Sequence, residues 1–64
     1  MDNIFSSSAG DCFELGKIAY NDGDHYHCIL WMTQSLELLD NEVNKTVDRA
    51  VLLDYLAYSQ YVVS

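Results

Sequence analysis

Apolar side chains recur at spacings of three and four residues along most of the chain, a pattern typical of amphipathic helices. From Asp11 to Asn21 the recurring positions are Cys12, Leu15 and Ala19, with Gly16 on the same face. From His25 to Leu39 a broader apolar stripe follows, made of Cys28, Trp31, Met32, Ser35, Leu36 and Leu39. In the last segment, which runs to the chain's end, Ala50, Leu53, Leu56 and Ala57 share one face. The pattern predicts an all-α fold.

Two polar segments separate these helices. Asn21-Asp22-Gly23-Asp24 is a turn signal, and Asp24 is suited to cap the second helix. Residues 40–45 form the second break, after which Thr46 is the expected N-cap, with Asp48 in the first turn where a negative charge suits the helix dipole. The Ser-rich residues 1–8 are expected to be a flexible N-terminus, and 9–64 the domain.

The order of these elements matches a tetratricopeptide-type repeat. Such a repeat pairs two antiparallel helices, with small residues where they face each other, and has a period of about 34 residues. Leu15-Gly16 and Leu56-Ala57 hold equivalent positions, with extra residues in the 40–46 loop. The chain therefore resembles one full helix pair plus the first helix of a second repeat, whereas a solenoid normally has about three repeats and a cap.

Composition narrows the class of partner. Half of the 64 residues are apolar, there is no proline, and the net charge is −7, with only Lys17, Lys45 and Arg49 basic. Such a chain is repelled by nucleic acid and by anionic membranes, so a neutral or basic ligand is expected. No apolar run approaches the roughly 18 residues of a spanning helix. The first ten residues lack the features of a signal peptide.

Three tyrosines, Tyr55, Tyr58 and Tyr61, form a row on the last helix, preceded by Asp54. At about 100° per residue, each is rotated by roughly 60° from the one before, so the row lies beside the predicted core stripe. Phe13, Lys17 and Tyr20 occupy matching positions on the first helix. One interpretation is a groove for a proline-rich peptide in polyproline II conformation. The alternative is a contact surface for another helix.

The sequence gives little support for a metal site, a disulfide or a catalytic triad. His25 and His27 stand two residues apart and point to different sides of a helix, so no metal site is expected. Cys12 and Cys28 are expected to be buried free thiols, with a disulfide as the alternative. Trp31 and Met32 fit the core of the helix pair. No catalytic triad is apparent.

Three blocks carry a family resemblance: DCFELGKIAY at 11–20, YHCILWM at 26–32 and LLDYLAYSQY at 52–61. Together they resemble the peptide-substrate-binding domain of the collagen prolyl 4-hydroxylase α subunit. The resemblance implies a tetratricopeptide-like module for proline-rich procollagen segments, whose groove is lined by an Asp-Tyr-x-x-Tyr-x-x-Tyr helix. On this chain those positions are Asp54, Tyr55, Tyr58 and Tyr61, to which Phe13 and Tyr20 are added from the first helix.

The resemblance also implies what a longer protein would do. The family's enzyme is an endoplasmic reticulum dioxygenase that uses Fe(II), 2-oxoglutarate and ascorbate, and it assembles with protein disulfide isomerase. The family's catalytic His-x-Asp pair has no counterpart here, so this chain is expected to bind peptide without being catalytic. The family continues after Tyr61 with a Gly-Asp turn and a further helix. Two rivals remain: an interaction repeat without proline specificity, and a fragment that barely folds.

Overall fold

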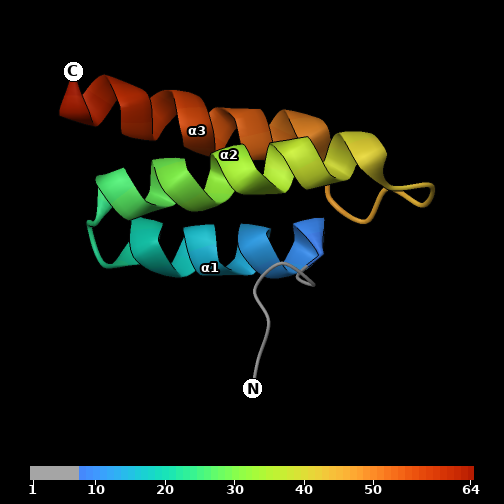
Figure 1. Ribbon diagram of the computed structural model, residues 1–64. Coiled ribbons are helices and arrows are strands. Elements are labelled where there is room, and N and C mark those ends of the chain that lie inside the picture. The colour runs from blue at the N-terminus through green and yellow to red at the C-terminus, as the bar shows by residue number, and fades with distance from the viewer. Residues whose placement is uncertain (1–7) are drawn as a thin grey trace.

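The computed structural model describes residues 8–64, which form three helices: α1 (Ala9–Asn21), α2 (His25–Asn41) and α3 (Arg49–Val63). The helices lie side by side with α2 in the middle, and each runs antiparallel to the next (Figure 1). The predicted all-α, tetratricopeptide-like arrangement is confirmed. Most of the expected flexible N-terminus, residues 1–7, lies outside the described residues.

Helix α1 begins two residues before the predicted start, because Ser8 is its N-cap. The Ser8 hydroxyl accepts the Asp11 N–H at 3.1 Å, and the Asp11 carboxylate accepts the Ser8 N–H at 3.3 Å. This reciprocal capping box satisfies donors that have no partner inside the helix. The Glu42 carboxylate, from the far end of α2, accepts the Ala9 N–H at 2.8 Å. The start of α1 is therefore tied to the end of α2.

The turn between α1 and α2 follows the sequence prediction. Gly23 has φ of 78°, a left-handed conformation that glycine adopts without steric cost. The N–H of Asp24 donates to the Ala19 carbonyl and that of Gly23 to the Tyr20 carbonyl, which closes a Schellman motif. Asp24 then caps α2, as predicted, by accepting the His27 N–H at 3.2 Å.

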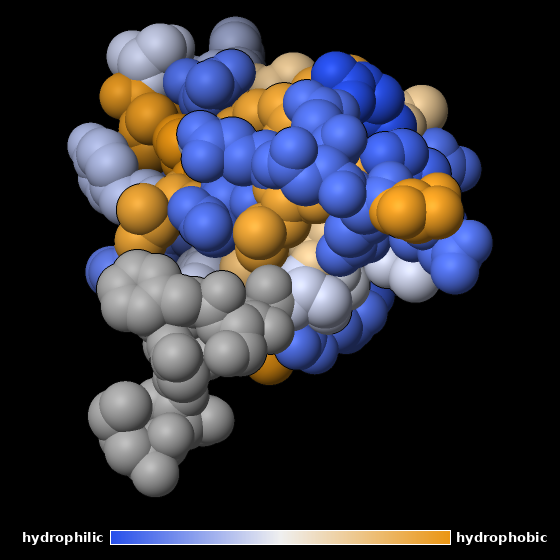
Figure 2. Space-filling view, turned by 45° about the vertical axis from the view of Figure 1, so that its right-hand side comes forward, coloured by the Kyte–Doolittle hydropathy of each residue, from blue (hydrophilic) through white to orange (hydrophobic). Residues whose placement is uncertain are grey.

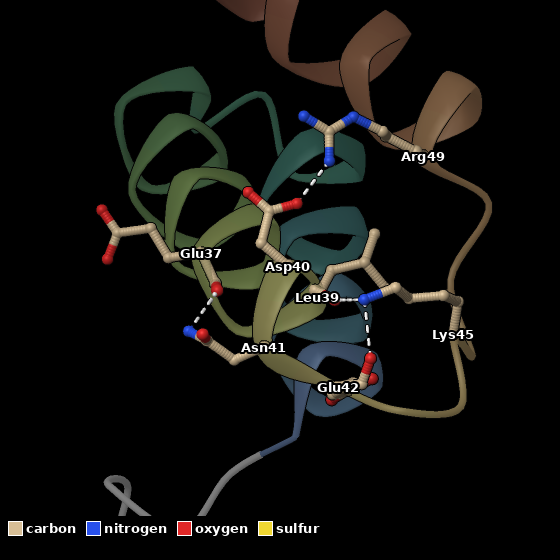
Figure 3. A network of polar contacts seen from close by, with 7 residues as sticks. All are labelled: Glu37, Leu39, Asp40, Asn41, Glu42, Lys45 and Arg49. Carbon is tan, nitrogen blue, oxygen red and sulfur yellow. Dashed lines mark hydrogen bonds and ion pairs between the residues drawn. The ribbon is translucent and has the colours of Figure 1, made fainter.

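The loop between α2 and α3 is held by basic side chains (Figure 3). Lys45 Nζ donates to the carbonyls of Leu39 and Glu42, each at 2.6 Å, and so satisfies the C-terminus of α2. Arg49 Nη1 donates to the Asp40 carboxylate across the loop. Together these contacts fix the direction in which the chain enters α3.

The predicted N-cap at Thr46 is wrong. Asp48 caps α3 by accepting the Ala50 N–H at 2.9 Å, while the Thr46 hydroxyl lies 3.4 Å from the Glu42 carboxylate. The helix begins later than predicted because Val47 turns its side chain into the core, which keeps the preceding backbone in the loop.

The core lies mainly between α1 and α2. Met32 is fully buried and its side chain lies directly over Gly16, which is also buried. Cys12 and Cys28 are buried and free, as predicted, and Trp31 is half-buried. Leu15, by contrast, is exposed, because α2 covers the α1 face centred on Cys12, Gly16 and Ala19.

The predicted core face of α3 is largely wrong. Leu52 and Ser59 are its fully buried residues, and Tyr55 and Leu56 are half-buried beside them. Ala50, Leu53 and Ala57 are exposed, and no helix of residues 8–64 packs on them. The predicted stripe and the observed one both have helical spacing. Within residues 8–64, only the observed stripe, made of Leu52, Tyr55, Leu56 and Ser59, is packed against the other helices.

The contact at Gly16 provides a stability test. A Cβ atom at Gly16 would lie 2.7 Å from Met32 Cε and 3.2 Å from Met32 Cγ, whereas a Cβ atom at Gly10 would meet nothing closer than 3.7 Å. We expect Gly16→Val to lower the free energy of unfolding by about 2 kcal/mol through overpacking. The matched Gly10→Ala should raise it by about 0.5 kcal/mol, since alanine favours the helix. Urea unfolding followed by circular dichroism measures the free energy of unfolding of both variants. Equal changes in the two variants would contradict a close contact between Gly16 and Met32.

The cap of α2 makes stability depend on pH. Hydrogen bonds from the His27 N–H and the His27 ring hold the pKa of the Asp24 carboxyl below its ordinary value. The stabilisation is therefore present above the ordinary aspartate pKa of about 4 and is lost as pH falls through the lower pKa of the folded state. We expect Asp24→Asn, which can still accept the His27 N–H, to lose less stability between neutral and acidic pH than the unmodified chain. Thermal melts of both proteins across that pH range test this. An equal fall in melting temperature for Asp24→Asn and the unmodified chain would contradict it.

Candidate functional site: an aromatic pocket between the first and third helices

Aromatic rings join α1 to α3 on the side where the two helices come together. The Tyr55 ring of α3 makes edge contacts with two rings of α1: Phe13 at a centroid distance of 5.8 Å and Tyr20 at 5.0 Å. The ring planes are nearly perpendicular, at 82° and 90°. Edge-to-face pairs of this kind are favourable because a ring's positive edge meets the negative face of its neighbour. Tyr55 therefore has a fixed orientation.

The cluster continues outward along the tyrosine row. The Tyr58 ring lies 5.8 Å from the Tyr20 ring and 6.4 Å from the Tyr61 ring. Exposure increases along the row: Tyr55 is half-buried, Tyr58 is 50% exposed and Tyr61 is 76% exposed. The row thus passes from a packed anchor to rings available for contact with a ligand.

An open pocket of about 430 Å³ lies against this cluster. Its lining residues are Tyr20, Val51, Asp54, Tyr55 and Tyr58. Aromatic rings and a valine supply apolar walls, while tyrosine hydroxyls and one carboxylate supply polar groups. Concave sites with mostly apolar walls and a few polar groups are typical of ligand binding.

Asp54 is the charged side chain among the residues that line the pocket. None of the chain's three basic side chains lines it: Lys17 pairs with Glu14 at 3.0 Å and lies over the Phe13 ring, while Lys45 and Arg49 hold the loop. Hydrophilic side chains cover much of the face around that loop (Figure 2). Within residues 8–64 no cation pairs with Asp54. The pocket therefore favours a neutral or basic ligand.

The two histidines have separate partners. His25 Nδ1 lies 2.9 Å from the Ser59 hydroxyl oxygen, and His27 Nδ1 lies 2.7 Å from the Asp24 carboxylate. In the part of the chain that the structure describes, no group of three or more His, Cys, Asp or Glu side chains is arranged to hold a metal ion. Burial raises the pKa of the Cys12 thiol, with a further rise from Asp11, which favours the unreactive neutral form.

The structure brings four of the six candidate residues to the pocket wall: Asp54, Tyr55, Tyr58 and Tyr20. Phe13 instead supports Tyr55 from α1, and Tyr61 extends the row beyond the wall. Sequence reasoning missed Val51 and His25, which contacts Tyr20 and Tyr58. Val51 precedes Asp54 by nearly one helical turn and could have been found by that spacing. Nothing in the sequence alone paired His25 with α3.

Comparison with known proteins identifies the family of this chain. Residues 9–64 match the family described as the prolyl 4-hydroxylase peptide-substrate-binding domain. The chain belongs to this family. It is 52% identical over 54 residues to human prolyl 4-hydroxylase subunit alpha-1, and 48% identical over 56 residues to subunit alpha-2 of Gallus gallus. It is 46% identical over 54 residues to subunit alpha-2 of Caenorhabditis elegans.

These alignments cover most of the chain but little of its relatives. They span 84%, 88% and 84% of the chain, respectively, and 10% of each relative. The match therefore concerns the peptide-substrate-binding domain of prolyl 4-hydroxylase α subunits. Among residues 8–64, no helix has the length and apolarity needed to cross a bilayer.

The aromatic cluster predicts unequal roles for two tyrosines of this domain. Tyr55→Ala removes the edge contacts with Phe13 and Tyr20, and we expect it to lower the free energy of unfolding by about 2 kcal/mol. The matched Tyr61→Ala removes a mostly exposed ring and should change stability by less than about 0.5 kcal/mol. Chemical denaturation of both variants measures the difference. Equal losses would mean that Tyr55 does not anchor α3.

Proposed function

We propose that this domain binds proline-rich, procollagen-like peptide segments in the aromatic pocket. The observation that carries the proposal is the tyrosine row, which Tyr55 anchors by edge-to-face contacts and whose rings become more exposed from Tyr55 to Tyr61. Proline-rich segments favour polyproline II, which needs little further ordering to enter an aromatic groove. The family description supports a peptide as the ligand.

The spacing of the row suits such a ligand. Tyr55 and Tyr61 are separated by six residues, or about 9 Å of helix rise. One turn of polyproline II also spans about 9 Å. Proline rings can pack on the phenol faces, while tyrosine hydroxyls donate to the backbone carbonyls that polyproline II leaves free. A neutral peptide also avoids repulsion by Asp54, and a basic residue beside the prolines would gain from it.

The family supports a proposal for a longer protein that contains this domain. We propose that the domain is part of a prolyl 4-hydroxylase α subunit that hydroxylates proline in the endoplasmic reticulum lumen, with protein disulfide isomerase as partner. Such an enzyme uses Fe(II), 2-oxoglutarate and ascorbate. A non-haem iron site needs two histidines and a carboxylate that converge. His25 and His27 do not fit this requirement, because Ser59 and Asp24 hold them separately. This chain thus supplies peptide binding, and the hydroxylation belongs to another region of the longer protein.

A second candidate is a helical interaction repeat without proline specificity. Leu53, Ala57 and Val62 are exposed on α3, and a neighbouring helix could cover them. Under this alternative the tyrosine row contacts protein rather than a proline-rich peptide. Replacement of Tyr58 distinguishes the two candidates. The first predicts a loss of peptide affinity, and the second predicts a change in oligomeric state without a change in peptide affinity.

We expect Tyr58→Ala to weaken binding of a single-stranded Pro-Pro-Gly repeat peptide by about tenfold, because an aromatic anchor at the centre of an interface commonly contributes more than 1 kcal/mol. The fold should survive, since the Tyr58 ring is half exposed. Tyr26→Ala is the matched control, because Tyr26 is 72% exposed on α2 and outside the pocket lining.

Titration of the peptide into isotopically labelled chain, followed through backbone amide NMR shifts, measures both effects. Saturable shifts centred on residues 54–61 support the proposal. A dispersed spectrum without shifts contradicts it. A change in oligomeric state without a change in peptide affinity favours the interaction repeat. A collapsed spectrum would mean that the isolated chain does not fold.

A further inference from the structure

His25 is the first residue of α2, yet its ring faces the other two helices. It makes an edge contact with Tyr20 of α1 at 5.4 Å and 87°, and another with Tyr58 of α3 at 5.9 Å and 66°. Since Tyr20 and Tyr58 also contact each other at 5.8 Å, these rings form a closed triangle, two of whose members line the pocket. All three helices therefore contribute a ring to this cluster.

The orientation of the His25 ring is set by Ser59. The Ser59 side chain is fully buried, and its hydroxyl oxygen lies 2.9 Å from His25 Nδ1. A buried hydroxyl without a partner is costly, so this hydrogen bond has a strong preference to form. Ser59 directly follows Tyr58 in α3. The bond thus ties the start of α2 to the backbone that carries the exposed tyrosine ring.

We propose that His25 is a positioning residue of the peptide site: held by Ser59, its imidazole fixes the ring of Tyr58 in the orientation that receives the ligand. This inference rests on the proposed peptide-binding function. Half of Tyr58 is exposed, so its ring is free to turn toward solvent unless neighbouring rings hold it. Tyr20 and His25 are those neighbours. A ring already fixed loses less conformational entropy when a peptide binds, which increases affinity.

Two substitutions separate this role from simple packing. His25→Phe keeps an aromatic ring but cannot bond Ser59, and Ser59→Ala keeps the imidazole but removes its partner. Alanine is small and favours helix, so the second variant should retain the fold. We expect each to weaken binding of the single-stranded Pro-Pro-Gly repeat peptide about threefold, the scale of one net hydrogen bond. The double variant should bind no more weakly than the single variants, because all three lack the same bond.

Ser35→Ala is the matched control for Ser59→Ala. Ser35 is also a fully buried helical serine, but its hydroxyl donates to the Ala9 carbonyl at 2.7 Å, away from the pocket. Ser35→Ala should lower stability without changing peptide affinity. A second readout comes from the free protein, through the ring-proton NMR shifts of Tyr58. Ser59→Ala and His25→Phe should move these shifts toward those of an unconstrained tyrosine, and Ser35→Ala should not.

The possible results are distinguishable. If the unmodified chain folds but does not bind the peptide, the proposed function fails and this inference fails with it. If the chain binds and Tyr58→Ala weakens binding, but His25→Phe and Ser59→Ala bind like the unmodified chain, then the function stands and the positioning role is overturned. Losses that multiply in the double variant also overturn it, because the two side chains would then act independently. Losses of affinity that do not multiply, together with shifted Tyr58 resonances, establish the role.

Discussion

The close approach of α1 to α2 at Gly16 is the contact on which the rest of the structure depends. With no side chain at that position, Met32 lies against the α1 backbone and the two helices pack closely. Contacts at the other end of α1 maintain this spacing, since both Ser35 and Glu42 bond to Ala9. Tyr20 follows Gly16 by about one helical turn, so the same spacing decides whether its ring can reach Tyr55. Packing within the first helix pair therefore determines the position of the pocket wall.

Aromatic side chains of this domain both pack beside the core and line the pocket. Phe13 and Tyr55 pack beside the core, Tyr20 and Tyr58 line the pocket, and Tyr61 is mostly exposed. The inner rings give the outer rings fixed neighbours, and a site built on helices is held more rigidly than one built on loops. Under the proposed function, these held rings would face a polyproline II peptide, whose backbone makes no internal hydrogen bonds.

Helix ends were only partly predictable, and the start of α3 shows one reason. Asp24 caps α2 as expected because the Schellman motif before it is local and depends on one glycine, Gly23. Thr46 is a capping residue by type, yet Asp48, whose type is preferred over threonine at N-caps, caps α3. The difference comes from Val47 and Lys45, whose contacts with the core and with the end of α2 hold the loop until residue 48. Such long-range contacts leave no periodic signal in the sequence.

The sequence by itself determined the number and approximate extent of the helices, the turn at Gly23, the family, and the spacing of the tyrosine row. These properties depend on neighbours three or four residues apart, and local periodicity encodes them. The tertiary structure alone decided that Leu52 and Ser59, rather than Leu53 and Ala57, face the core, and that His25 packs against the rings of Tyr20 and Tyr58. Periodicity defines the faces of a helix about its own axis. Which face becomes buried depends on the rotation and distance of neighbouring helices, and these follow from side-chain packing between residues far apart in the chain.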